Sequence, residues 1–131
     1  MKVIIAGTRW ITDYALLERV IQCVIDKTGL VITEVVSGKA DGPDTMGEEW
    51  AKQRGIPIND KPADWKKYGL AAGGIRNKEM GDYADVLIAL WNDKSTGTKD
   101  MMDYMWKLNK QVYYHSPSHP DPVPQLFDFF D

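Results

Sequence analysis

Apolar runs and helical repeats alternate along the chain. Residues 2–6 (KVIIA) form a continuous, largely β-branched run that stops at Gly7, which is typical of a strand buried on both faces of a parallel sheet. The next apolar residues recur at helical spacing: Leu16, Leu17, Val20, Ile21, Val24 and Ile25. Thr12 or Asp13 suits the start of this helix and Gly29 its end.

The same alternation continues to residue 114. Further strands are predicted over residues 34–37, 56–60, 85–91 and 111–114. Further helices are predicted over residues 43–54, from Gly73 and Gly74 to Asp82, and over 98–109, the last with Met101, Met102, Met105 and Leu108 on a core face. Pro57 favours an edge position for its strand. Residues 61–71 show no clean period, and we expect a long loop there.

The resulting order is β-α-β-α-β-α-β-α-β, which predicts an α/β fold. We expect a Rossmann-like three-layer sandwich: a mostly parallel five-stranded sheet with helices on both faces. Residues 1–114 form this nucleotide-binding domain, and residues 115–131 form a Pro-rich, extended tail outside the sheet.

Composition narrows the function. The 131 residues are 44% hydrophobic and 27% charged, enough for a real core. A net charge of −3 argues against a dominant electrostatic grip on DNA or RNA. The single cysteine, Cys23, excludes an intrachain disulfide and suits a reducing compartment. The apolar run before Gly7 is too short for a signal peptide or a membrane span. We therefore expect a cytoplasmic protein.

Glycine-bearing loops follow three of the predicted strands. They are Gly7-Thr8-Arg9, then Ser37-Gly38 with Asp44 beyond it, and Ser95-Thr96-Gly97-Thr98 after Trp91. Ligands bind beyond the carboxyl ends of parallel strands, and helix N-termini there favour phosphate. These loops predict a site for a nucleotide or a sugar phosphate.

Each loop also has a simpler explanation. A lone glycine at a strand end is commonly a turn, and residues 95–98 can simply cap a helix. The spacing is neither GxGxxG nor a Walker A loop. Arg76, at the start of a helix beside Asn77, suits a two-pronged contact to phosphate, but equally suits an exposed helix face. We expect no cofactor and no metal site, and assign no role to His115 or His119.

Aromatic residues stand next to these loops: Trp10, Trp65, Tyr68 and Trp91. Aromatic faces stack on nucleobases. The alternative for Trp65 and Tyr68 is that they anchor the long loop onto the core.

Several of these segments together resemble the YspA-like (cpYpsA-related) proteins of the SLOG superfamily, which are often phage-encoded. The matching segments are GTR at 7–9, SGKADGPDTMGEEWAKQRG at 37–55, PADWKKYG at 62–69, AGGIRNKEM at 72–80, ADVLIALW at 84–91 and STGT at 95–98. The resemblance implies a Rossmann-like fold and a nucleotide-related ligand, whether sensed or sequestered, held by Arg76 together with the glycine loops.

Two relatives suggest other functions. LOG-type phosphoribohydrolases cleave the N-glycosidic bond of nucleoside monophosphates, and their RKxxM motif looks like residues 76–80. Arg76 would then be catalytic, but their glutamate position falls on Met101, which cannot act as an acid. Asp100 is expected to point to a different helix face; Glu48, Glu49 or Glu79 are the remaining substitutes. The DprA proteins share the RN element and suggest DNA binding, which the acidic charge opposes.

Partners are inferred by analogy only. Relatives in the superfamily are commonly dimers or larger, which implies a homo-oligomer here. Residues Gln125–Phe129 are loosely similar to the peptide that docks on bacterial sliding clamps; a tail that folds onto its own domain or onto a second subunit is the alternative.

Overall fold

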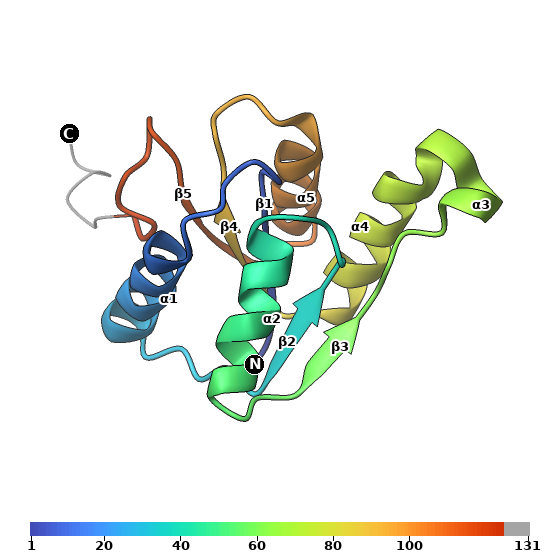
Figure 1. The fold of residues 1–131 in the computed structure, drawn as a ribbon. Coiled ribbons are helices and arrows are strands. Elements are labelled where there is room, and N and C mark those ends of the chain that lie inside the picture. The colour runs from blue at the N-terminus through green and yellow to red at the C-terminus, as the bar shows by residue number, and fades with distance from the viewer. Residues whose placement is uncertain (125–131) are drawn as a thin grey trace.

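The fold is an open α/β sandwich built on a five-stranded, all-parallel sheet (Figure 1). A computed structural model describes residues 1–124. The strand order is β3-β2-β1-β4-β5, so the chain moves outward from β1 in one direction and then returns to add strands on the other side. The predicted fold class is confirmed.

The elements follow the predicted order, with small shifts at their ends. The strands are β1 (Lys2–Gly7), β2 (Glu34–Ser37), β3 (Ile58–Asp60), β4 (Val86–Leu90) and β5 (Gln111–His115). The long helices are α1 (Tyr14–Thr28), α2 (Pro43–Gln53), α4 (Ala72–Tyr83) and α5 (Thr96–Lys107). β3 lies at a sheet edge, as Pro57 indicated.

Two helix ends confirm the predicted capping chemistry. The Asp13 side chain accepts a hydrogen bond from the Leu16 amide at 3.1 Å and so caps α1. Gly29 ends the same helix in the left-handed region, with φ of 72°.

The prediction of a structureless loop over residues 61–71 is wrong. The short helix α3 (Trp65–Tyr68) and a 3-10 turn (Gly69–Ala71) occupy its second half. Asp64 caps α3 by accepting a hydrogen bond from the Lys67 amide at 3.1 Å. A helix of four residues is too short to show the periodicity by which helices are predicted from sequence. No residue of α3 is buried, and the segment projects from the body beyond α4 (Figure 1).

Each face of the sheet carries its own core. One face packs β1 and β4 residues such as Ile5 and Ile88 against α1 and the Trp50 turn of α2. The other packs Ile4 and Leu87 against α4 and α5. The methionine stripe of α5 confirms the predicted core role, because Met101, Met102 and Met105 are buried in this second cluster.

The chain beyond β5 leaves the sheet and turns back beside it. Within residues 116–124 the structure has a Ser116–His119 bridge, and a Lys27–Asp121 ion pair at 2.9 Å holds this segment to α1. The clamp-like Gln125–Phe129 segment lies outside the described residues. Across residues 1–124, no helix combines the length and the apolar character needed to cross a bilayer.

Candidate functional site

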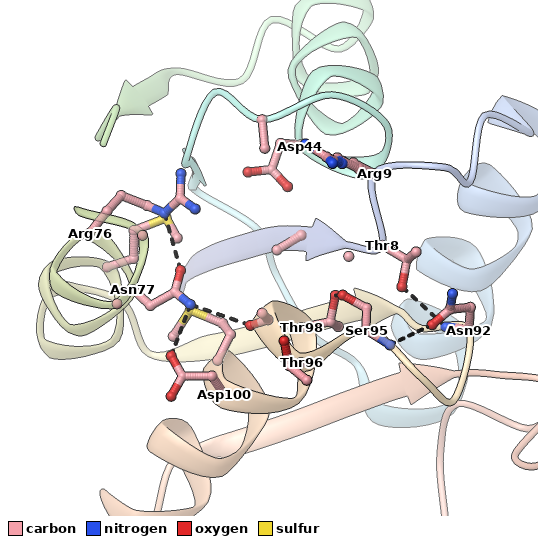
Figure 2. Close-up of a pocket in the computed structure, with 18 of the residues that line it drawn as sticks. Thr8, Arg9, Asp44, Arg76, Asn77, Asn92, Ser95, Thr96, Thr98 and Asp100 are labelled. Atoms are coloured by element: carbon pink, nitrogen blue, oxygen red, sulfur yellow. Dashed lines mark hydrogen bonds between the residues drawn. The ribbon is translucent and has the colours of Figure 1, made fainter. Parts of the chain in front are cut away.

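A pocket of about 850 Å³ opens at the carboxyl edge of the sheet. Its walls come from the loops after β1 and β4, from the start of α2, and from α4 and α5 (Figure 2). The strand order reverses between β1 and β4, so their loops diverge and leave a crevice. The pocket therefore lies where the sequence placed the ligand.

The β1 loop is locked against β4. The Thr8 amide donates to the Leu90 carbonyl at 2.9 Å, and the Thr8 hydroxyl accepts from the Asn92 amide at 3.2 Å. A Cβ on Gly7 would lie 2.2 Å from the Leu90 carbonyl oxygen. Gly7 lines the pocket, but this close strand contact already requires a glycine there. Arg9 follows, with its guanidinium 4.7 Å from the centre of the Trp10 ring.

The β2 loop contributes less to the pocket than the sequence suggested. Ser37 is fully buried and donates to Glu48 at 2.8 Å, and Glu48 also pairs with Lys39 at 3.0 Å. These contacts hold the β2 loop in place. Ser37 and Gly38 do not line the pocket.

Asp44 lines the pocket from the first turn of α2 and is 4% exposed. Burial raises the pKa of its carboxyl to about 6, and the Arg76 charge and the Ala40 and Gly38 amides only partly offset this. Its carboxyl therefore titrates about two pH units above an exposed aspartate.

Arg76 is held in place by its neighbours on α4 and the β2 loop. Its NH1 group donates to the Gly38 carbonyl at 2.7 Å. Its Nε donates to the Asn77 side-chain oxygen at 3.1 Å, as Figure 2 shows. The Asn77 amide nitrogen in turn donates to Asp100 at 3.2 Å. The alternative of an unconstrained surface arginine is therefore excluded by the geometry: Arg76 is fixed at the pocket wall.

The β4 loop is a compact turn that leads into α5. The Asn92 side-chain oxygen accepts from the Lys94 and Ser95 amides at 2.9 and 2.8 Å. Trp91 donates through its indole N–H to the Ser95 carbonyl at 3.0 Å; it supports the turn and does not line the pocket. α5 begins at Thr96, two residues earlier than predicted.

Most of the predicted site residues meet at this pocket. Those that line it are Gly7, Thr8, Arg9, Asp44, Trp65, Arg76, Asn77, Ser95, Gly97 and Thr98. Trp65 is 58% exposed and Tyr68 is 40% exposed, so the alternative that they anchor a loop onto the core is wrong.

The sequence did not single out Asn92 or Lys94 as site residues. An asparagine directly after a strand is a turn signal and marks Asn92 in retrospect. Asp100 and Met101 lie on different faces of α5, as predicted: Met101 is buried in the pocket floor, and Asp100 lies exposed at the pocket rim. The helical spacing gave no indication that both faces border the pocket. Glu48, Glu49 and Glu79, the acids considered instead, do not line the pocket. In residues 1–124, no three His, Cys, Asp or Glu side chains gather into a metal site.

A comparison with protein families matches residues 1–68 to the YspA, cpYpsA-related SLOG family. The chain belongs to this family. The chain is also similar to the Gene 61 protein of Mycobacterium phage D29, with 38% identity over 74 residues. That match spans 52% of this chain and 59% of the phage protein. The family match covers the β1 loop, α2 and α3, whereas Arg76 and the α5 turn lie beyond it.

Proposed function

We propose that the pocket binds a nucleotide through a phosphate seated on the first turn of α5. The observation that carries this proposal is an uncapped helix N-terminus facing the pocket. The N-cap residue, Ser95, makes no side-chain hydrogen bond to a backbone amide of the helix, since its hydroxyl accepts from the Thr98 hydroxyl at 3.3 Å instead. Thr96, Gly97 and Thr98 all line the pocket. Their amides have no intrahelical acceptor, and the helix dipole adds positive potential at this end.

Three cationic side chains on the same pocket support an anionic ligand. The pocket is lined by the cationic side chains of Arg9, Arg76 and Lys94. Among residues 1–124, no carboxylate oxygen lies within 4.0 Å of a charged nitrogen of these three side chains. Arg76 uses its NH1 and Nε groups in the protein, so its NH2 group remains to donate to a phosphate oxygen.

The base side of the ligand is supported by two exposed indole rings. Trp10 is 75% exposed and Trp65 is 58% exposed, and both line the pocket. Rings left open to water at a pocket rim suit stacking on a nucleobase, which contributes about 1–3 kcal/mol per base. A pocket of about 850 Å³ is within the range of small-molecule sites, and SLOG membership points to a nucleotide-related function.

The test is to measure, by titration calorimetry, the binding of a panel of nucleoside 5′-monophosphates and of inorganic phosphate. Arg76→Ala is expected to weaken binding at least about tenfold, since charged hydrogen bonds contribute about 1.5–3 kcal/mol. Arg19→Ala is the matched control, because it removes one positive charge from the exposed surface of α1. Equal affinities for the two variants would contradict the assigned site, and no binding by the wild type would contradict the function.

A nucleotide-processing enzyme of the phosphoribohydrolase type is the second candidate. Asp100 favours it, since this carboxylate lies at the pocket rim and accepts from Asn77 at 3.2 Å. A carboxylate there can accept a proton from water that attacks the sugar carbon. Chromatography of the same panel after incubation tests for released base. Release that Asp100→Asn abolishes, and that Asp103→Asn on the same helix retains, would establish hydrolysis.

A further inference from the structure

The segment after β5 forms a rigid turn beside the pocket. Ser116 and His119 exchange two backbone hydrogen bonds, each of 3.0 Å. The His119 ring stacks on Tyr114 of β5, with ring centres 4.4 Å apart and planes 20° from parallel. Ser116 is fully buried. These contacts fix the position of Ser118, which lies between the two paired residues.

Ser118 holds the β4 loop through Asp93. The Ser118 amide donates to one carboxylate oxygen of Asp93 at 2.9 Å, and its hydroxyl donates to the other at 2.6 Å. These contacts, the hydroxyl first among them, lower the pKa of the Asp93 carboxyl below its ordinary value.

The residue held in this way is conformationally unusual. Asp93 has φ of 68°, in the left-handed region that most residues other than glycine avoid and that aspartate enters more readily than most. Its neighbours, Asn92 and Lys94, line the pocket. The Asn92 side chain accepts hydrogen bonds from amides of the loop itself. Ser118 holds the same loop from the segment after β5, through the two contacts with Asp93 that we call the clasp. Without the clasp, Asp93 loses the two contacts that hold its side chain, and it is then free to move and carry Lys94 and Ser95 with it.

We infer that Ser118 is a positioning residue for the ligand: by clasping Asp93, it keeps the Asn92–Ser95 loop and the start of α5 in the arrangement that receives a phosphate. This rests on the proposed nucleotide function. A loop already ordered in the free protein spares the ligand the entropy of ordering it, so the clasp acts on affinity through preorganisation and touches no ligand itself.

The same segment offers a matched control. Its second tether, the Lys27–Asp121 ion pair, attaches it to α1 and not to the pocket loop. Ser118→Ala therefore removes the hydroxyl contact with Asp93 and leaves the amide contact, and Asp93→Ala removes both. Lys27→Met breaks a contact of 2.9 Å elsewhere. Ser118→Thr restores the hydroxyl and is the conservative rescue.

Two measurements test the inference on the full chain. The first is amide hydrogen exchange of residues 92–98 in the free protein. The second is the affinity for inorganic phosphate and the four ribonucleoside 5′-monophosphates. Ser118→Ala is expected to speed exchange in this segment and to weaken binding by about threefold to tenfold, a fraction of the loop-ordering entropy. Lys27→Met should change neither, and Ser118→Thr should restore both.

The outcomes separate the two claims. Unchanged exchange at residues 92–98 in Ser118→Ala overturns the positioning role, whatever the ligand does. Faster exchange together with wild-type affinity also overturns it, because the clasp would then order the loop in the wild type without strengthening binding. If Lys27→Met weakens binding as much as Ser118→Ala, the effect belongs to the segment as a whole. If the wild type binds no probe, the proposed function fails, and the role of Ser118 in ligand binding fails with it. The exchange result still decides whether Ser118 holds the loop.

Discussion

Asp44→Asn should stabilise the protein above pH 6 and have little differential effect below pH 4. The carboxyl of Asp44 is 4% exposed, and burial raises its pKa from 3.8 to about 6. The neighbouring Arg76 charge lowers the pKa but does not compensate for the burial, and Glu48 raises it further. Asparagine has nearly the same shape and no charge, so the substitution removes the penalty of an ionised group in this position.

The sign follows from proton linkage. Between pH 3.8 and about 6 the folded protein keeps the proton on Asp44 and the unfolded chain has lost it. The unfolded state therefore binds fewer protons, and wild-type stability falls as the pH rises through this window. The contribution is fully present below the unfolded pKa and is lost above the folded one. Each pKa unit corresponds to about 1.4 kcal/mol, so the total change is on the order of 3 kcal/mol.

Urea denaturation of the wild type and Asp44→Asn from pH 4 to pH 7.5 measures this difference. Loss or gain of hydrogen bonds by the amide shifts the whole curve by a constant, so the pH dependence of the difference is the quantity to compare. The advantage of the variant should grow by about 2 kcal/mol between pH 4 and pH 6.5, since part of the full change already occurs below pH 4, and then level off. A flat difference would refute the raised pKa. A difference that shrinks with rising pH would show that the attraction of Arg76 outweighs burial.

Two glycines of the site should behave in opposite ways. Gly7→Ala should destabilise the fold by about 2–3 kcal/mol, measured by urea denaturation, because the new Cβ would lie 2.2 Å from the Leu90 carbonyl oxygen of the central sheet; wild-type stability would show that β1 and β4 can separate cheaply. Gly97→Ala should leave the free energy of unfolding within about 0.5 kcal/mol of the wild-type value, since nothing lies within 4 Å of its Cβ position. Calorimetry should nevertheless show weaker nucleotide binding, because the methyl group would project from the helix turn proposed to hold the phosphate. Unchanged affinity would move the phosphate away from α5.

The sheet could be predicted from the sequence because its signals are local and strong. The run over residues 2–6 and the one over 85–91 are continuous and β-branched or aliphatic, and each ends at a loop residue. Asp13 and Gly29 mark both ends of α1 by well-understood capping chemistry. The crossover rule for parallel strands then fixes where the loops gather, which is why the general place of the pocket followed from the alternation alone.

The details of the site depended on contacts between distant residues, which no single stretch of sequence displays. Ser37 has the residue type expected of a phosphate-binding loop, but its hydroxyl is bound to Glu48, eleven residues later. Asp100 lies on a different face of α5 from Met101, as predicted, but helical spacing gives only the angle between neighbours and not the width of the pocket that both of them border. Its contact with Asn77 crosses from α4 to α5, a pairing that depends on how those helices pack.

Three unfavourable features of the described residues lie at or beside one pocket. Asp44 has a buried carboxyl with a raised pKa. Lys39 and Asp93 have left-handed backbones, with φ of 62° and 68°, next to pocket-lining residues. Each feature lowers the stability of the free protein, and each is held by specific contacts: Lys39 by Glu48, Asp93 by Ser118. A fold selected for stability alone would keep glycine at the two left-handed positions and an apolar residue in place of Asp44. Unfavourable features that specific contacts support are characteristic of binding sites, and these three argue for a ligand at this pocket, although a further left-handed residue, Asn109 with φ of 58°, lies after α5 and away from it.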